Sequence, residues 1–174
     1  MNKRLIIGIL MLPVFTILVF TSKSFAASDI TPEKQAIIVE SCVGAQTVLQ
    51  RIQHNDAATR VNRGQGYETL VSRLMTPLNS RTTSGGYNNS ASLMVDTTKR
   101  YQQSLESFKD NYKQYDNALS ASLKVKCKTD PTKFYGYLEE ARKQRQALAV
   151  DVSNLSGLIA EYRGNVVKLK SEVQ

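Results

Sequence analysis

Apolar residues recur in alternating steps of three and four along most of the chain, which is the spacing of one face of a long helix. The clearest run follows Asp130 and Pro131, and Arg145 is the one polar residue that interrupts it. An Asp–Pro pair is typical of a helix start, with Asp as the N-cap and Pro at the first helical position. The pattern therefore predicts a helix over residues 131–173. Its apolar positions are Phe134, Leu138, Ala141, Leu148, Val152, Leu155, Ile159, Tyr162, Val166, Leu169 and Val173.

Two further segments show the same spacing. One predicts a helix over about residues 92–126, with Met94, Thr98, Tyr101, Leu105, Phe108, Tyr112, Tyr115 and Leu119 in step. The other begins at Thr31–Pro32 and predicts a helix over about residues 31–80, with Ile38, Cys42, Ala45, Leu49 and Ile52, then Tyr67, Leu70, Leu74 and Leu78. The stretch between these two sets, "QHNDAATRVNRGQGY", has few apolar residues. The segment "SRTTSGGYNNS" has the composition of a turn.

These elements predict an all-α fold, an elongated antiparallel bundle of three helices. The two cysteines supply an independent register for it. The midpoint between Cys42 and Cys127 falls at Ser84–Gly85, inside the predicted turn, so a hairpin of the first two helices would place the cysteines opposite each other. We predict a Cys42–Cys127 disulfide that stabilises the fold by roughly 4 kcal/mol; two buried free thiols are the alternative. The hairpin arms match only if the first helix runs through Gly64 and Gly66 without a break.

The chain begins with Lys3 and Arg4, an apolar run over residues 5–20, and small and polar residues ending at Ala26. This order is typical of a secretory signal peptide, here residues 1–26, followed by one domain over residues 27–174. A helix needs about 20 residues to cross a bilayer, so a run of this length favours cleavage over an uncleaved membrane anchor at 5–20. The rest of the chain is predicted to be extracytoplasmic: secreted, periplasmic or at the cell surface.

The net charge is +8 for the whole chain, and +5 once the three basic residues of the leader are removed. A basic balance favours acidic partners. An exported chain without a nucleic-acid motif makes anionic lipid or cell-wall polymer the better expectation than nucleic acid. Four lysines near the second cysteine, at the pole of the rod with the disulfide, would make such a contact; a solvated turn is the alternative. They are Lys124, Lys126, Lys128 and Lys133.

The hairpin register brings polar residues of all three helices to the middle of the rod. We expect a polar core layer in which Asp56 accepts hydrogen bonds from arginine and a tyrosine supplies a hydroxyl group; side chains that merely reach out to water are the alternative. Its members would be Asp56, Arg60, Arg63, Tyr112 and Arg145.

The predicted turn offers a second candidate surface, at Gly85, Gly86, Tyr87 and Asn88. An exposed tyrosine flanked by Gly, Asn and Ser suits recognition, although most such turns only reverse the chain. A phosphate loop at "RGQGY" is disfavoured because such loops follow a strand, and no strand is predicted. His54 is the single histidine, so neither a catalytic triad nor a metal site is predicted, and no cofactor or small-molecule substrate is expected.

The leader, the early cysteine, "NDAATRVNRGQGYETLVSRLMTPLNSR", the second cysteine before Asp–Pro and the closing "AEYR" helix resemble uncharacterised exported helical proteins of small-genome, candidate-phyla bacteria. The resemblance implies a helical fold and no activity. In size, charge and export the chain is also loosely similar to basic periplasmic chaperones with helical arms. We therefore expect a non-enzymatic envelope or cell-surface interaction protein that binds a protein partner or itself. The alternative is an oligomeric, chaperone-like scaffold.

Overall fold

The computed structural model describes residues 30–174, so the expected signal peptide (1–26) and anchor (5–20) lie outside the described residues. Within that range the regular elements are all helical: α1 (Pro32–Thr69), the π-helix η1 (Leu70–Met75), α2 (Thr76–Ser84), α3 (Asn88–Lys124) and α4 (Pro131–Val173). The predicted all-α fold is confirmed. Thr31 and Asp130 cap α1 and α4 as expected, each accepting a hydrogen bond from a backbone N–H three residues on.

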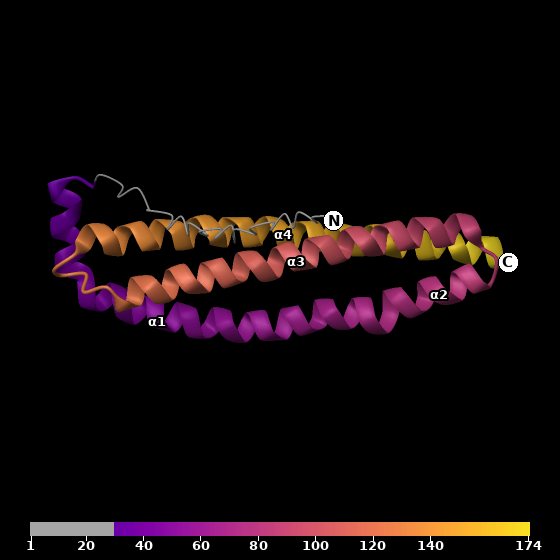
Figure 1. Ribbon diagram of the computed structural model, residues 1–174, viewed down its shortest axis with the longest axis horizontal. Coiled ribbons are helices and arrows are strands. Elements are labelled where there is room, and N and C mark those ends of the chain that lie inside the picture. Colours follow the sequence, from indigo (N-terminus) through magenta and orange to yellow (C-terminus); the bar gives the residue numbers. More distant parts are fainter. Residues whose placement is uncertain (1–29) are drawn as a thin grey trace, which may run out of the picture.

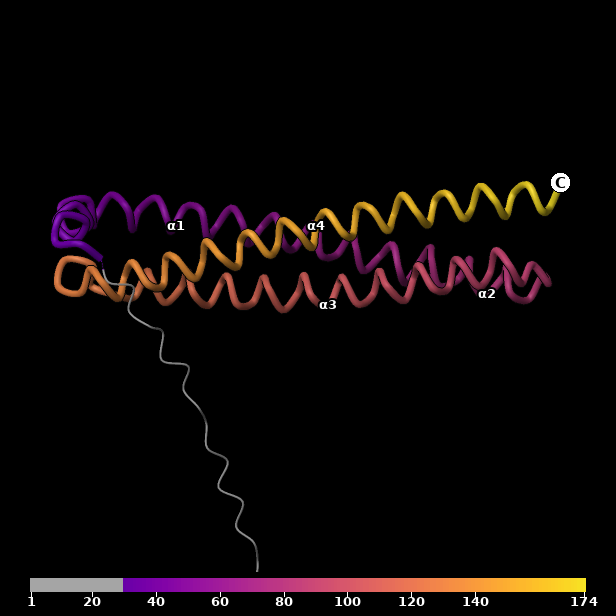
Figure 2. The backbone as a smooth tube through the Cα atoms, turned by 90° about the horizontal axis from the view of Figure 1, so that it is seen from above, coloured from indigo at the N-terminus to yellow at the C-terminus, as the bar shows by residue number. Residues whose placement is uncertain are grey.

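The helices lie along one long axis and form a rod (Figure 1). At 1.5 Å per residue, α4 alone is about 65 Å long. One pole carries the start of α1 and the loop between α3 and α4, and the other carries the turn between α2 and α3 and the C-terminus. The first turns of α1 lie across the first pole instead of along the rod, as both views show (Figure 2).

The first predicted helix is one continuous helical path through Gly64 and Gly66, but η1 interrupts its regularity. Pro77 has no N–H to donate to the carbonyl four residues before it, and its ring would crowd that carbonyl. A wider π-helical turn at this point relieves the crowding. The wide turn also rotates the apolar face, so Val71 and Met75 are buried while Leu74, predicted to be in the core, is 49 % exposed.

The turn is shorter than predicted. Only Gly85, Gly86 and Tyr87 separate α2 from α3, and Asn88 is already the first residue of α3. Gly86 has a φ of +82°, a left-handed conformation that glycine adopts without strain. The Tyr87 ring is folded back against Gly85 and is half-buried, so the tyrosine is less exposed than expected, while Gly85, Gly86 and Asn88 are exposed. A recognition role for this turn stays a prediction.

The core confirms the predicted face of α3, since all eight residues that the sequence places in step on this helix (its seam residues) are buried. On α4 the seam residues are buried or half-buried except Val173, which is 57 % exposed at the chain end. A second row on α4, which the sequence pattern missed because it is polar, is also buried: Gln144, Asp151 and Asn165. These residues lie seven and fourteen positions apart, and Asp151 and Asn165 bond to side chains of α3, the helix against which α4 packs most extensively.

α1 behaves differently from the other long helices. Of its residues, only Cys42 is buried. It approaches α3 at intervals and α4 hardly at all. Along residues 30–174, no helix combines the length and apolarity that spanning a bilayer requires.

Candidate functional site

A disulfide fixes α1 to the α3–α4 loop. Cys42 and Cys127 are bonded, with their Cα atoms 5.7 Å apart, and both pack against Phe134 of α4. The predicted pairing is confirmed. The cysteines lie opposite each other because the hairpin turns close to their midpoint, as the register predicted.

Glutamine side chains extend this attachment along α1. Gln46 Nε2 donates to the carbonyl oxygen of Val125 at 2.9 Å, and Gln53 Nε2 donates to Ser120 Oγ at 2.7 Å and to Asp116 Oδ1 at 3.2 Å. These bonds tie α1 to α3 on one side. Toward α4 the polar contacts of α1 are longer, at 3.5 Å from Gln35 Nε2 to Thr132 Oγ1 and 3.7 Å from Asp56 to Arg145.

An apolar cavity of about 670 Å³ therefore lies between α1 and the α3–α4 pair. The α1 wall is built from small and branched residues in the three turns that follow Cys42. Val48 on this wall is 44 % exposed. The apolar lining consists of Gly44, Ala45, Val48, Leu49, Ile52, Leu119, Leu138 and Ala141.

A second cavity, of about 400 Å³, continues from the first and contains the predicted polar residues. Tyr115 OH donates to Asp56 Oδ2 at 2.5 Å, and Arg145 Nη2 lies 3.7 Å from the same oxygen. The guanidinium of Arg60 lies over the ring of Tyr112, 4.5 Å from its centroid. Arg63 lines the same cavity.

The structure thus brings all five predicted residues to one place but changes two details. The hydroxyl group that reaches Asp56 belongs to Tyr115, one step further along the α3 seam than Tyr112. The layer is not in the core: the side chain of Arg145 is 60 % exposed and that of Asp56 is 26 % exposed. Because α1 stands away from α4, these side chains lie along an open groove instead of being enclosed.

Burial and the neighbouring charges set the protonation of the two tyrosines. Burial, and then the hydrogen bond to the Asp56 carboxylate, raises the pKa of Tyr115 well above its ordinary value. Burial also raises the pKa of Tyr112, with Asp116 adding to the rise and Arg60 opposing it. Tyr115 therefore remains a hydrogen-bond donor at neutral pH, and the groove gains no negative charge from it.

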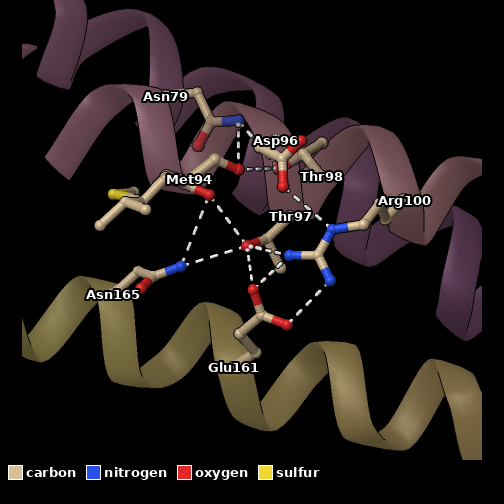
Figure 3. Close-up of polar contacts among 9 residues, drawn as sticks. Asn79, Met94, Asp96, Thr97, Thr98, Arg100, Glu161 and Asn165 are labelled. Carbon is tan, nitrogen blue, oxygen red and sulfur yellow. Dashed lines mark hydrogen bonds and ion pairs between the residues drawn. The ribbon is translucent and has the colours of Figure 1, made fainter. Parts of the chain in front are cut away.

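A separate polar network, absent from the sequence predictions, lies at the other end of the rod (Figure 3). Asn79 of α2 donates to Thr98 Oγ1 at 2.9 Å and accepts from Tyr162 OH at 2.8 Å. Asn165 of α4 donates to Thr97 Oγ1 at 3.1 Å. The network joins α2, α3 and α4 and fixes their register, since the side chains of Asn79 and Asn165 find partners only in this alignment.

Arg100 closes this network at the surface. It pairs with Glu161 of α4 and, at 3.0 Å, with Asp96. The guanidinium of Arg100 holds the pKa of Glu161 below its ordinary value. Because both ion pairs are exposed to solvent, they contribute little to stability, and the pair with Glu161 serves mainly to align α3 with α4.

The predicted basic pole is present. Lys124, Lys126, Lys128 and Lys133 are all exposed around the α3–α4 loop, and three of them border a shallow cavity with Asp130. Within residues 30–174, no three His, Cys, Asp or Glu side chains gather in a way that could hold a metal ion.

Comparison with family models, curated proteins and solved structures finds no match to this chain. The resemblance to exported helical proteins of candidate-phyla bacteria therefore stays a prediction. The class of protein that the fold and the groove define is an all-α, disulfide-clamped helical rod with an open groove along one side.

Proposed function

We propose that this protein is a non-enzymatic, exported interaction protein of the cell envelope or cell surface, and that it works by binding another molecule in the groove between α1 and α4. The observation that carries the proposal is the burial of α1. A helix of 38 residues that served only to complete the bundle would bury an apolar stripe, yet Cys42 is its single buried residue.

The ends of α1 explain how the groove stays open. The disulfide fixes one end, and at the other Tyr67 packs edge-on against Phe108 with ring centroids 5.6 Å apart. Between these points α1 is a continuous helix that bonds to α3 through Gln46, Gln53 and Asp56 and makes few contacts with α4. A cavity of about 670 Å³ with mainly apolar walls falls in the size range of ligand-binding sites.

Two observations support export. The order of charge and apolarity over residues 1–26 is that of a secretory signal. A disulfide between residues 85 apart is consistent with an oxidising compartment, where such bonds persist.

Site-specific photo-crosslinking in intact producing cells tests the proposal. A photoreactive amino acid replaces Val48 in the groove or, as the control, Val167 on the outer face of α4. Val167 is 62 % exposed against 44 % for Val48, so exposure alone favours the control. We expect a defined adduct from position 48 that position 167 does not give. Equal adducts from both positions, or none from position 48, would contradict the proposal.

A scaffold that self-associates is the second candidate, favoured by apolar side chains on outer faces. Val95, Val150 and Val167 are 49 %, 59 % and 62 % exposed. Leu158, which is not among the in-step residues of α4 either, is partly buried and packs against the core. Light scattering over a range of protein concentrations separates the two candidates: a monomer throughout would exclude the scaffold.

A further inference from the structure

The two cavities beside α1 form one groove with unlike halves. They share Tyr115 and Arg145 as lining residues, so the apolar half ends where the polar half begins. Gly44 and Arg60, which line opposite ends, are about four and a half turns apart on α1, or about 24 Å. The groove is therefore long, narrow and chemically graded.

The polar half has an excess of positive charge. Three arginines, Arg60, Arg63 and Arg145, line it together with a single carboxylate, that of Asp56. Arg145 and the Tyr115 hydroxyl already share that carboxylate. Within residues 30–174 neither Arg60 nor Arg63 takes part in an ion pair, and Arg60 lies over the face of the Tyr112 ring.

The apolar half carries no matching cationic excess. Besides Arg145 its charged lining residues are Glu40 and Arg142, which cancel, and Arg142 also pairs with Glu139. An occupant complementary to both halves has a long apolar body and one anionic end. A planar carboxylate suits guanidinium groups because it accepts two parallel hydrogen bonds from one of them.

Building on the proposed function, we propose that the groove binds a single free acyl chain that ends in a carboxylate, with the chain between α1 and α4 and the carboxylate at Arg60 and Arg63. The apolar half alone, at about 670 Å³, lies within the size range of small-molecule sites. This ligand class differs from the lipid surface expected at the lysine pole, because the groove receives one molecule along the side of the rod.

Fluorescence titration with 11-(dansylamino)undecanoic acid, kept below its micellar concentration, tests the proposal on the purified, oxidised protein. The methyl ester of the same probe is the uncharged control. We expect saturable binding of one acid per chain and binding of the ester about 10-fold weaker, the loss expected for two partly exposed charge pairs. The double variant Arg60→Gln/Arg63→Gln should weaken binding of the acid by the same factor. Arg51→Gln/Arg163→Gln removes the same charge outside the groove and should leave binding unchanged.

Gly44→Leu separates loss of the site from loss of the fold. A Cβ at Gly44 meets no atom within 4 Å, so leucine has room in the apolar half of the groove. Leucine is also a better helix former than glycine. We expect this variant to lose probe binding while its melting temperature does not fall.

Three outcomes would overturn the proposal. They are no saturable binding of the acid, an equal loss of affinity in the two double arginine variants, and undiminished binding in Gly44→Leu. Failure of the probe with a persisting protein adduct at position 48 would reject the acyl carboxylate and leave the proposed function standing. A dimer that Gly44→Leu disrupts would instead assign the groove to a second copy of the chain. If the probe fails and position 48 also gives no adduct, both proposals fall.

Discussion

Removing the disulfide should release α1 while the α3–α4 pair remains folded. The perturbation is Cys42→Ala/Cys127→Ala, with the reduced wild-type protein as a control that keeps both sulfur atoms. Cys42 is the one buried residue of α1. Its loss as a covalent anchor therefore leaves the part of α1 before Tyr67 attached mainly by the glutamine hydrogen bonds to α3 and by the hydrogen bond between Asp56 and Tyr115.

The magnitude follows from the length of the closed loop. A separation of 85 residues corresponds, in the chain-entropy model, to about 4.5 kcal/mol of stabilisation. Typical domains have only about 5–15 kcal/mol in total. The α3–α4 pair keeps its own core around Tyr101, Leu105 and Leu155, which the disulfide does not touch.

Hydrogen exchange read by mass spectrometry, together with urea unfolding, measures both effects. In the double variant and in the reduced protein, amides of residues 32–66 should lose protection, while those of α3 and α4 remain protected under mild conditions. The free energy of unfolding should fall by up to about 4.5 kcal/mol. A decrease in the free energy of unfolding of less than about 1 kcal/mol, or equal loss of protection in all three long helices, would refute the claim that the disulfide is the main attachment of α1.

Three further predictions concern stability. Asn79→Ala removes a buried amide from the hydrogen bonds with Thr98 and Tyr162 and should lower the free energy of unfolding by about 2 kcal/mol, measured by urea titration. Gly64→Ala/Gly66→Ala places methyl groups where nothing lies within 4 Å. Because alanine is the better helix former, this variant should raise the free energy of unfolding by about 1.5–2 kcal/mol in the same assay. Burial raises the pKa of Tyr162 from 10.0 to about 12, so stability present below pH 10 should be lost as the pH rises from 10 to about 12. Phenolate absorbance and far-ultraviolet circular dichroism, followed together, should show that ionisation accompanies loss of helix.

Each of these has its own contradicting result. Asn79→Ala with unchanged stability would mean that the buried network adds nothing to the fold. Gly86→Ala is the matched control for the glycine pair, because its φ of +82° should make alanine destabilising there. If the Gly64 and Gly66 variant were destabilised as well, α1 would not be helical through that stretch. Helix content that stays constant while every tyrosine ionises would contradict the burial of Tyr162.

The α3 face and the disulfide could be predicted from the sequence because their signals are local and regular. Tyrosine, leucine and phenylalanine recur on α3 without a break, and the cysteines are symmetric about a Gly–Gly turn. The buried polar row of α4, in contrast, escaped a pattern that counts apolar residues. Asn165 and Asp151 are buried only because α3 supplies partners for them, which a single helix cannot reveal.

The separation of α1 from α4 was the least predictable feature. Heptad spacing at Ala45, Leu49 and Ile52 predicted ordinary packing, yet these residues line the groove and are only partly buried. The polar stretch over residues 53–66 was the available signal, since it gives α1 too little apolar surface to close on α4. Pro77 was a sequence signal for an irregular turn in the first helix. Which residues that turn would bury, Val71 and Met75 instead of Leu74, depends on the geometry of the π-helix.

The central claim is that the groove beside α1 holds another molecule. Native mass spectrometry of the protein, purified without denaturant from the cells that produce it, tests this most directly when wild type and Gly44→Leu are compared. The account predicts a non-covalent adduct of defined mass on the wild-type chain that is absent from Gly44→Leu. A wild-type chain without any adduct, or an adduct that both proteins carry equally, would contradict it.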